Sequence, residues 1–464
     1  MSIITDTELI KARLNDNIYT KMDVIDDLVN EKDNTYALQA YRYYDNAADI
    51  KNRKIYDIDE NGDKFIDITA TNEASKSSHN YHQILVDQKV QYLFANQFTL
   101  SDDDRASNTI DKIKKEVNLK DFNVLLSEIG IDASNTGESY LHPYIDAKGN
   151  FNYIHVPYTQ SIPIYSTQEP DKLDAFIRYY PGYDNGDSVI FLEFWDDKNV
   201  EYYIKNDQGV SPNPQYENHI QPHFYNAFDN TGDSWDLGVP FIQFKNNYRK
   251  TSDLKLYKDL IDSYNLTIAE FEDNVKEFQE VLYAVKGAGN ATPYQLRSQI
   301  KKSKIIKLKG DETGIDVVQI DIPVEARKFS SQTSQSNIFK LGGGVDVTKE
   351  DFGNNSGVAL KFIYYLLDIK ASKMEAYFNK GLNLFFDFLI EHINRKESLA
   401  IDNTLTVTLN KRMISNDSEL AKIAVDSVDI LDKETIIKNH PWGDDPERIM
   451  AAKEIEDNNS FGLE

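Results

Sequence analysis

The chain has 464 residues, enough for two or three structural regions, and its 40% hydrophobic and 12% aromatic content supports globular folding. Its net charge of −25 should repel DNA phosphates and membrane surfaces, except where basic residues are locally concentrated. The lack of cysteine excludes disulfides, thiolate metal sites and cysteine nucleophiles. Without a membrane-length apolar run or an apolar N-terminal signal region, we expect a soluble intracellular product.

Helical and hairpin patterns alternate in the N-terminal part. Apolar residues at helical spacing predict helices within residues 5–50, 82–96 and 109–135. The segment KIYDIDENGDKFIDI predicts a hairpin that turns at Asn61 and Gly62. It also imitates a calcium-binding loop, but Ile68 stands where a bidentate glutamate is needed. A hairpin turn is therefore the favoured interpretation.

The pattern changes to period two between residues 138 and 245. Segments such as YLHPYID, AFIRYYP and SVIFLEFWDD are separated by Gly, Asn, Asp and Pro, which predicts a mostly antiparallel β region. Helical spacing returns from Ser252 to Lys286, and a strand-like VVQIDIP follows after a short basic segment.

That basic segment, residues 286–309, reverses the charge of the chain locally. It contains no Asp or Glu and seven basic residues: Lys286, Arg297, Lys301, Lys302, Lys304, Lys307 and Lys309. The functional interpretation is a docking surface for an acidic protein or a passing phosphate backbone. A solvated helix face is the alternative.

Residues 324–341 have an uncharged polar centre, SSQTSQSN. We interpret them as a helix with a neutral polar face, framed by Val324, Phe329, Ile338, Phe339 and Leu341. A solvated linker is the alternative, because the central residues have only modest helix propensity.

A triple glycine, Gly342–Gly344, follows this segment, and we expect it to form a mobile joint rather than a packed element. Asn355 and Ser356 then suit a helix N-cap. Sustained i, i+3, i+4 spacing predicts one long helix from Gly357 to Glu397, with Gly381 a candidate position for a bend. One further strand is expected within residues 398–410, and short helices in the acidic tail.

Catalytic and metal-binding motifs are weak throughout. His79 and His82, and likewise His219 and His223, have chelating spacings but lack a pattern such as HExxH, so hydrogen-bonded histidines are favoured. Neither a GxSxG elbow nor a GxxxxGK[ST] loop is present. We predict no catalytic residue, no metal site and no cofactor, and another subunit must supply any nucleotide hydrolysis.

Five groups of segments occur in a specific order, although no single string is diagnostic. They are ILVDQKVQYLFANQ (84–97), TGESYLHPYIDAKGNF with SIPIYS (136–166), VPFIQFKNN with SDLKLYKDLIDSYN (239–265), DIPVEA (321–326) and FGNNSGVALKF with LLDIKA (352–375). The set covers about residues 80–460 and resembles the portal (head–tail connector) proteins of tailed double-stranded-DNA bacteriophages. The resemblance is to the subfamily common in phages of Gram-positive hosts.

The resemblance implies an α+β portal fold assembled into a ring, typically of twelve copies in the virion, around a DNA tunnel. Its regions would be a wing (1–250), two stem helices (251–285 and 323–341), a clip (286–322), a tunnel loop (342–356), a long helix with a returning wing strand (357–410) and a helical crown (411–464). The function implied is DNA packaging and ejection at one capsid vertex, without enzymatic activity.

Site residues and partners follow from the same resemblance. The DNA-facing tunnel loop would comprise Gly342, Gly343, Gly344, Val345, Asp346, Val347, Thr348, Lys349, Glu350, Asp351, Phe352 and Asn354. The tunnel face of the stem would comprise Ser330, Gln332, Ser334, Gln335 and Asn337. The clip would present Arg297, Lys301, Lys302, Lys304, Lys307 and Lys309 to the terminase and later to the neck adaptor. Other implied partners are further copies of the chain, double-stranded DNA bound without sequence preference, and the major capsid and scaffolding proteins, but no membrane; the location is the virion, after assembly in the host cytoplasm.

The residues themselves agree with a conduit. A neutral polar stem face offers DNA phosphates no ionic partners, and Glu350 and Asp351 offset Lys349 in the loop. Two alternatives remain. One is another virion structural or adaptor protein without a tunnel role, and the other is a metal-dependent hydrolase that uses Asp57 with Asp59, or His79 with His82.

Overall fold

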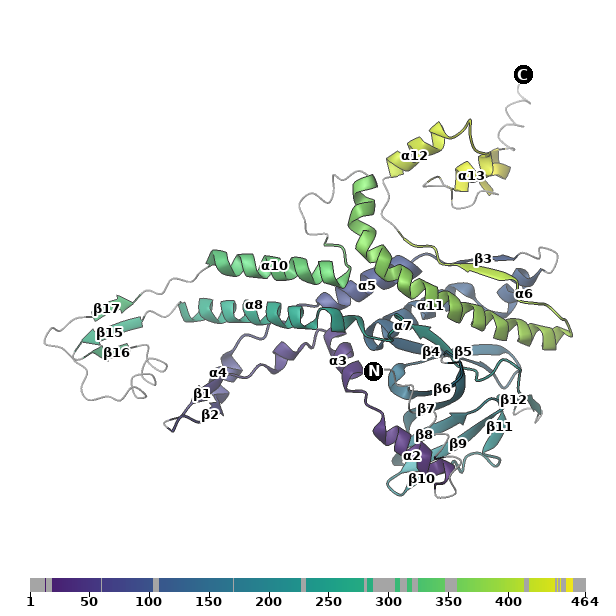
Figure 1. Ribbon diagram of the computed structural model, residues 1–464, viewed down its shortest axis with the longest axis horizontal. Helices are drawn as coiled ribbons and strands as arrows, with labels where there is room; N and C mark the ends of the chain where they lie inside the picture. Colours follow the sequence, from purple (N-terminus) through teal and green to yellow (C-terminus); the bar gives the residue numbers. More distant parts are fainter. Residues whose placement is uncertain are drawn as a thin grey trace.

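The computed structural model describes residues 13, 19–59, 61–102, 108–169, 171–226, 231–278, 282–286, 305–308, 315–318, 324–346, 357–412, 417–438, 440, 443 and 448–453. A broad body of helices and sheets carries two long helices that project side by side to a small sheet at their tip (Figure 1). The predicted α+β class is confirmed. None of the described helices is both long and apolar enough to cross a membrane.

From Lys21 onward the N-terminal elements follow the predicted pattern, with α4 as an added helix; the helical stretch expected from residue 5 lies mostly outside the described residues before Lys21. These elements are α2 (Lys21–Glu31), α3 (Thr35–Tyr44), the 3-10 helix η1 (Asp49–Asn52), the hairpin β1 (Tyr56–Ile58) and β2 (Lys64–Ile66), and α4 (Ile68–Glu73). A capping box between Thr20 and Asp23 starts α2. The hairpin interpretation is confirmed, and Gly62 supplies the positive φ, +91°, that its turn requires.

Two antiparallel sheets form the β region expected between residues 138 and 245. The first has the order β14-β4-β5, from β4 (Glu138–Ile145), β5 (Phe151–Val156) and β14 (Ile242–Lys245). The second has the order β10-β9-β8-β7-β6, from β6 (Ser161–Tyr165), β7 (Leu173–Asp184), β8 (Asp187–Trp195), β9 (Asn199–Asn206) and β10 (Gly209–Pro212), with β11 (Ile220–Pro222) also paired to β9. Smaller elements are η2 (Tyr158–Gln160) and the pair β12 (Phe224–Asn226) and β13 (Thr231–Asp233).

The main core lies where helices cross the first sheet. Its helices are α5 (Tyr81–Phe94), α6 (Thr109–Glu116), α7 (Leu119–Thr136) and α11 (Gly357–Glu397), flanked by the pair β3 (Thr99–Asp102) and β18 (Leu405–Thr408). Phe122 of α7 stacks on Phe385 of α11 with ring centroids 4.2 Å apart. Gly381 lets Phe244 of β14 lie against α11, since an added Cβ would come within 2.7 Å of that ring. The single helix predicted from Gly357 to Glu397 is confirmed, and a bend at Gly381 stays a prediction.

The projecting pair consists of α8 (Lys258–Phe278), preceded by η3 (Asp253–Leu256), and α10 (Val324–Gly342). The tip sheet has the order β16-β15-β17, from β15 (Leu282–Lys286), β16 (Ile305–Leu308) and β17 (Ile315–Val318). The helix expected from Ser252 to Lys286 is thus wrong at both ends. Residues 282–286 pair with two strands, and this tertiary pairing overrides the helical spacing.

Residues 324–341 are helical, so the linker alternative is wrong. Beyond β18 the chain forms α12 (Asp417–Asp426) and α13 (Lys433–Lys438), the short helices expected in the acidic tail.

Candidate functional site

The candidate site is the junction where α10 ends and the chain turns toward α11. Gly343, at φ +65°, terminates α10 in a left-handed cap in which Gly344 N–H donates to the carbonyl oxygen of Phe339 at 2.8 Å. A Cβ on Gly342 would come within 2.5 Å of Leu85 of α5. The expected mobile joint is therefore wrong, because these glycines are required for close packing and for the cap.

Two side chains hold the next residues in place. Gln88 of α5 donates to the carbonyl oxygen of Val345 at 2.8 Å and accepts from its N–H at 2.9 Å. Lys370 of α11 donates to the carbonyl oxygen of Gly342 at 2.7 Å. The Val345 side chain is only 3% exposed and packs in the main core, so it does not face outward in the chain as described. Residues 342–346 form a fixed base, from which the rest of the candidate loop leaves.

A buried ionic cluster lies beneath this base and joins three elements. Asp253 of η3 accepts from Lys89 of α5 at 2.7 Å and lies 3.0 Å from the ammonium of Lys370. Burial alone would raise the pKa of Asp253, but Lys370 and Lys89 outweigh it and hold that pKa well below its usual value. Burial lowers the pKa of Lys89 to about 8, against the attraction of Asp253. Asn246 completes the cluster by bonding both Lys89 and Asp253.

Histidines of the two candidate metal pairs are hydrogen-bonded. His82 bonds Tyr257 at 2.8 Å and Asn135 at 2.9 Å through its two ring nitrogens, while His79 bonds Asn265. His223 bonds the backbone of Asp196. Within the described ranges, no group of three His, Asp or Glu side chains is placed to hold a metal ion. The preference for hydrogen-bonded histidines is confirmed for these three.

Buried histidines should make folding sensitive to acid. Burial lowers the pKa of His82 to about 4 and that of His142 to about 3, from 6.5, so both stay neutral in the fold while the unfolded chain binds protons below pH 6.5. We expect the free energy of unfolding to fall by about 1 kcal/mol for each histidine between pH 7.5 and 5.5. Urea unfolding at the two pH values measures this change in the free energy of unfolding. The lower pH, 5.5, stays above the pI of 4.8, where solubility is lowest.

The variant His142→Phe is the control for this prediction. His142 stacks on Phe241 with centroids 4.5 Å apart, so phenylalanine keeps the stacking and removes the titration. Its overall stability will drop, because the carbonyl oxygen of Pro240 loses its partner. Between pH 7.5 and 5.5, the free energy of unfolding of this variant must nevertheless fall by less than that of the parent chain. An equal fall would show that His142 does not contribute to the pH effect.

The five polar residues expected to share one face of α10 do not do so. At 100° per residue, Ser330, Ser334 and Asn337 form one stripe, whereas Gln332 and Gln335 lie on other sides of the helix. Ser330 and Asn337 are exposed, while Ser334 and Gln335 are half-buried. The stripe Ser330–Ser334–Asn337, together with exposed Leu341, is therefore the uncharged surface that α10 presents beside α8.

Several predicted site residues lie outside the described residues. In the loop these are Val347, Thr348, Lys349, Glu350, Asp351, Phe352 and Asn354; in the basic segment they are Arg297, Lys301, Lys302, Lys304 and Lys309. Lys307 belongs to strand β16 in the tip sheet. The structure thus describes the elements next to these two segments: the junction at one end of α10 and the tip sheet at the other.

Sequence reasoning missed the ionic cluster. A signal for Lys89 exists, since it shares the apolar side of its helix with Val86 and Leu93, both buried. A lysine in that position needs a buried counter-charge. Its partner could not be chosen among 76 acidic residues, because Asp253 is far away in the chain.

Known proteins are similar to this chain over most of its length. Residues 26–460 match the family model described as "Phage portal protein, SPP1 Gp6-like". The chain is 33% identical over 443 residues to the portal protein of Bacillus phage SPP1, covering 94% of this chain and 86% of that protein. It is 32% identical over 455 residues to the portal protein of Clostridium phage phiCD119, covering 91% and 95%. A solved structure of the neck of an empty GTA particle aligns with a TM-score of 0.40 and 10% identity, over 78% of this chain and 90% of that one.

Proposed function

The chain belongs to the family of SPP1 Gp6-like phage portal proteins, and from this membership we propose that its copies form a ring at one capsid vertex through which double-stranded DNA is packaged and ejected. The resemblance found in the sequence is thereby confirmed as to family. We extend the proposal to a ring of twelve copies in the virion, assembled in the host cytoplasm beside capsid and scaffolding proteins. In it the chain acts as a conduit and not as an enzyme.

The uncharged stripe of α10 is the observation that carries the conduit proposal. Ser330, Ser334 and Asn337 offer hydroxyl and amide groups but no cation, so a DNA backbone that passes them finds no ion pair to hold it. The basic residues of α10 are Arg327 and Lys328 near its start and Lys340 in its last turn, so the stripe between them carries no charge. A surface that guides a polyanion without binding it must lack such charges along its length.

The fixed base at residues 342–346 supports the tunnel-loop proposal. The cap at Gly343 and the Gln88 clamp on Val345 hold one end of residues 347–356, and α11 holds the other from Gly357. A segment held at both ends can contact passing DNA by shape without detaching. We propose these residues as the DNA-facing loop.

The tip sheet β15–β17 supports a docking role. It lies at the far end of α8 and α10, away from the body, where another protein can reach it (Figure 1). The basic segment of residues 286–309 runs along the chain from β15 to β16, and Lys286 and Lys307 belong to these two strands. We propose that the tip receives the terminase during packaging and the neck adaptor afterwards.

One experiment tests ring and conduit together, using the parent chain and a variant that lacks residues 347–354. The deletion spares the base at 342–346, so we expect both proteins to show rings with a central hole by negative-stain electron microscopy. In an in vitro packaging reaction only the parent should support DNA entry.

Absence of rings from the parent under all assembly conditions would exclude the portal role. Rings with undiminished packaging by the variant would favour the alternative, a virion structural or adaptor protein in which this loop does not face DNA.

A further inference from the structure

Residues 54–74, here called the arm, project from the body as a short hairpin and helix (Figure 1). The arm comprises β1, β2 and α4, and none of its described residues is buried. Its exposed large apolar side chains are Tyr56, Ile58, Phe65, Ile66 and Ile68, with Ile68 71% and Tyr56 58% exposed. A two-stranded hairpin is at best marginally stable alone in water, and the described residues of the chain leave this apolar surface without a cover.

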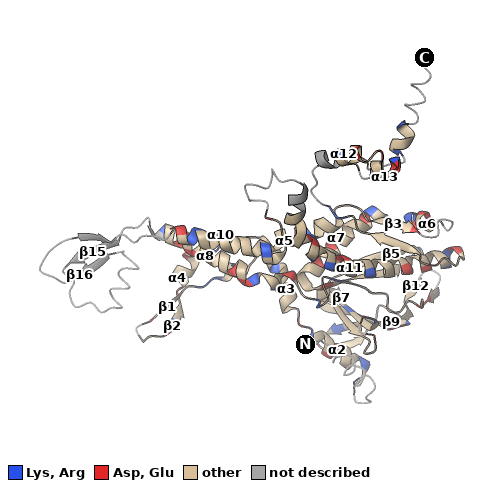
Figure 2. Cartoon of the chain, turned by 45° about the horizontal axis from the view of Figure 1, so that its top comes forward, with Lys and Arg blue, Asp and Glu red and all other residues tan. Residues whose placement is uncertain are grey.

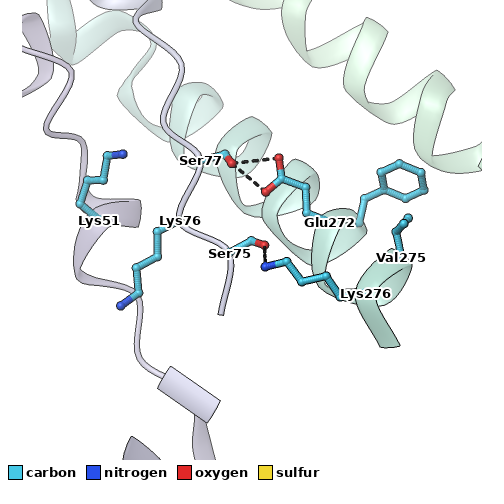
Figure 3. A pocket seen from close by; sticks show the side chains of 8 residues that line it. Lys51, Ser75, Lys76, Ser77, Glu272, Val275 and Lys276 are labelled. Atoms are coloured by element: carbon cyan, nitrogen blue, oxygen red, sulfur yellow. Dashed lines mark hydrogen bonds between the residues drawn. The ribbon is translucent and has the colours of Figure 1, made fainter. Parts of the chain in front are cut away.

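The root of the arm is nevertheless firmly anchored to α8. Arg53 forms an ion pair with Asp273 at 2.6 Å, and the N–H of Ser75 donates to the same carboxylate at 2.7 Å. Lys276 donates to the hydroxyl of Ser75, and Ser77 donates to Glu272 (Figure 3). These contacts fix where the arm points. An element held at a set angle with its apolar side chains exposed is prepared for a partner.

A matching surface lies on the other side of the projecting helices. In Figures 1 and 2, α10 and the arm lie on opposite sides of α8. On α10, Phe329 is 72% and Val324 50% exposed, whereas the side that meets the body is buried at Ile338 and Phe339. Phe329 is thus the exposed apolar residue on the outer side of α10 in the half nearer the tip, while Val324, 140° round the helix, lies on another side.

The charges of the two surfaces are complementary. Between Lys54 and Glu73 the arm has six acidic and two basic residues. Between Val324 and Leu341, α10 has three basic residues and one acidic; Lys328 directly precedes Phe329 in the sequence, and Lys340 lies 20° from it round the helix. Opposite charges around an apolar centre steer two such surfaces together and disfavour contact between two arms.

We propose that the arm of one copy packs on the outer face of α10 of the next copy. The proposal rests on the ring of the proposed function and names the surfaces that close it. Because the two patches differ and lie on opposite sides of α8, each copy contacts two neighbours head to tail, the kind of interface that generates rings. Phe329 and Ser330 are 100° apart on α10, so Phe329 can face the arm of the neighbouring copy while Ser330 faces the central hole of the ring.

The lack of native cysteine makes cross-linking a clean test. The double variant Ile66→Cys with Phe329→Cys, assembled as the full chain, is treated with a short bismaleimide and run on a denaturing gel. We expect a ladder of three and more linked copies, because each copy has one thiol for each neighbour. Each single variant should stay monomeric on the gel. In the matched control, Ile66→Cys with Tyr183→Cys, Tyr183 is 76% exposed on β7, away from α10, and no ladder is expected.

Electron microscopy of the same samples distinguishes failure of the arm contact from failure of the proposed ring on which it rests. Rings without a ladder in the double variant would overturn the arm contact and leave the portal ring intact. Dimers from Ile66→Cys alone would overturn it too, since they would show that arms meet arms. If neither the parent nor the variants form rings, the proposed function itself fails.

Discussion

Replacing Asp253 by alanine should destabilise the fold by about 3–5 kcal/mol, a large part of the stability of a typical domain. The substitution leaves the ammonium groups of Lys89 and Lys370 close together without the carboxylate that both now face. Lys89 is fully buried, so water cannot replace the lost partner. Urea unfolding followed by circular dichroism measures the change.

Two further variants make this prediction specific. Asp259→Ala removes an exposed carboxylate from the first turn of α8 and should cost less than about 1 kcal/mol. Lys89→Met keeps the volume and the Asp253–Lys370 pair, so its cost should fall well below that of Asp253→Ala. An Asp253→Ala chain no less stable than the Asp259→Ala chain would show that the cluster does not hold the junction together.

The substitution Ser330→Lys should reduce DNA packaging by about tenfold or more, because in the proposed ring every copy would then present an ammonium to the passing phosphates. Each lysine that pairs with a phosphate adds about one unit to the slope of log affinity against log salt. Purified rings of this variant should therefore bind duplex DNA strongly at low salt and release it as salt rises. Filter binding and a packaging reaction measure the two effects.

Gln332→Lys provides the matched comparison. It adds the same charge to the same exposed helix, two residues along and far round from the stripe. Packaging by this variant should stay close to that of the parent. If Gln332→Lys impairs packaging as much as Ser330→Lys, the stripe Ser330–Ser334–Asn337 is not the surface that faces DNA.

The long regular elements of this protein could be predicted because their patterns are local. The 41-residue helix α11 and the hairpin at Gly62 follow from spacing and turn chemistry alone. The order of segments along the chain identified the family. Residues 282–286 could not be assigned, because their strand forms only by pairing with residues 305–308 and 315–318.

The candidate site was predicted less completely, for a similar reason. Three glycines in a row permit motion or close packing, and only the position of Leu85 decides between them. The ionic cluster joins Lys89, Asp253 and Lys370, which no pattern within one segment connects. The five polar residues of α10 were grouped by composition, whereas the helical angle separates them into different faces.

The position of the ionic cluster has a mechanical consequence. Asp253 sits at the root of α8, and Lys370 links it to the end of α10, so both helices share one fulcrum. With 21 residues in α8, the lever arm is about 30 Å, and a tilt of about 5° at the fulcrum shifts the tip sheet by about 3 Å. A displacement of the tip, where we propose that a partner docks, therefore reaches the residues that anchor the proposed loop as a much smaller displacement.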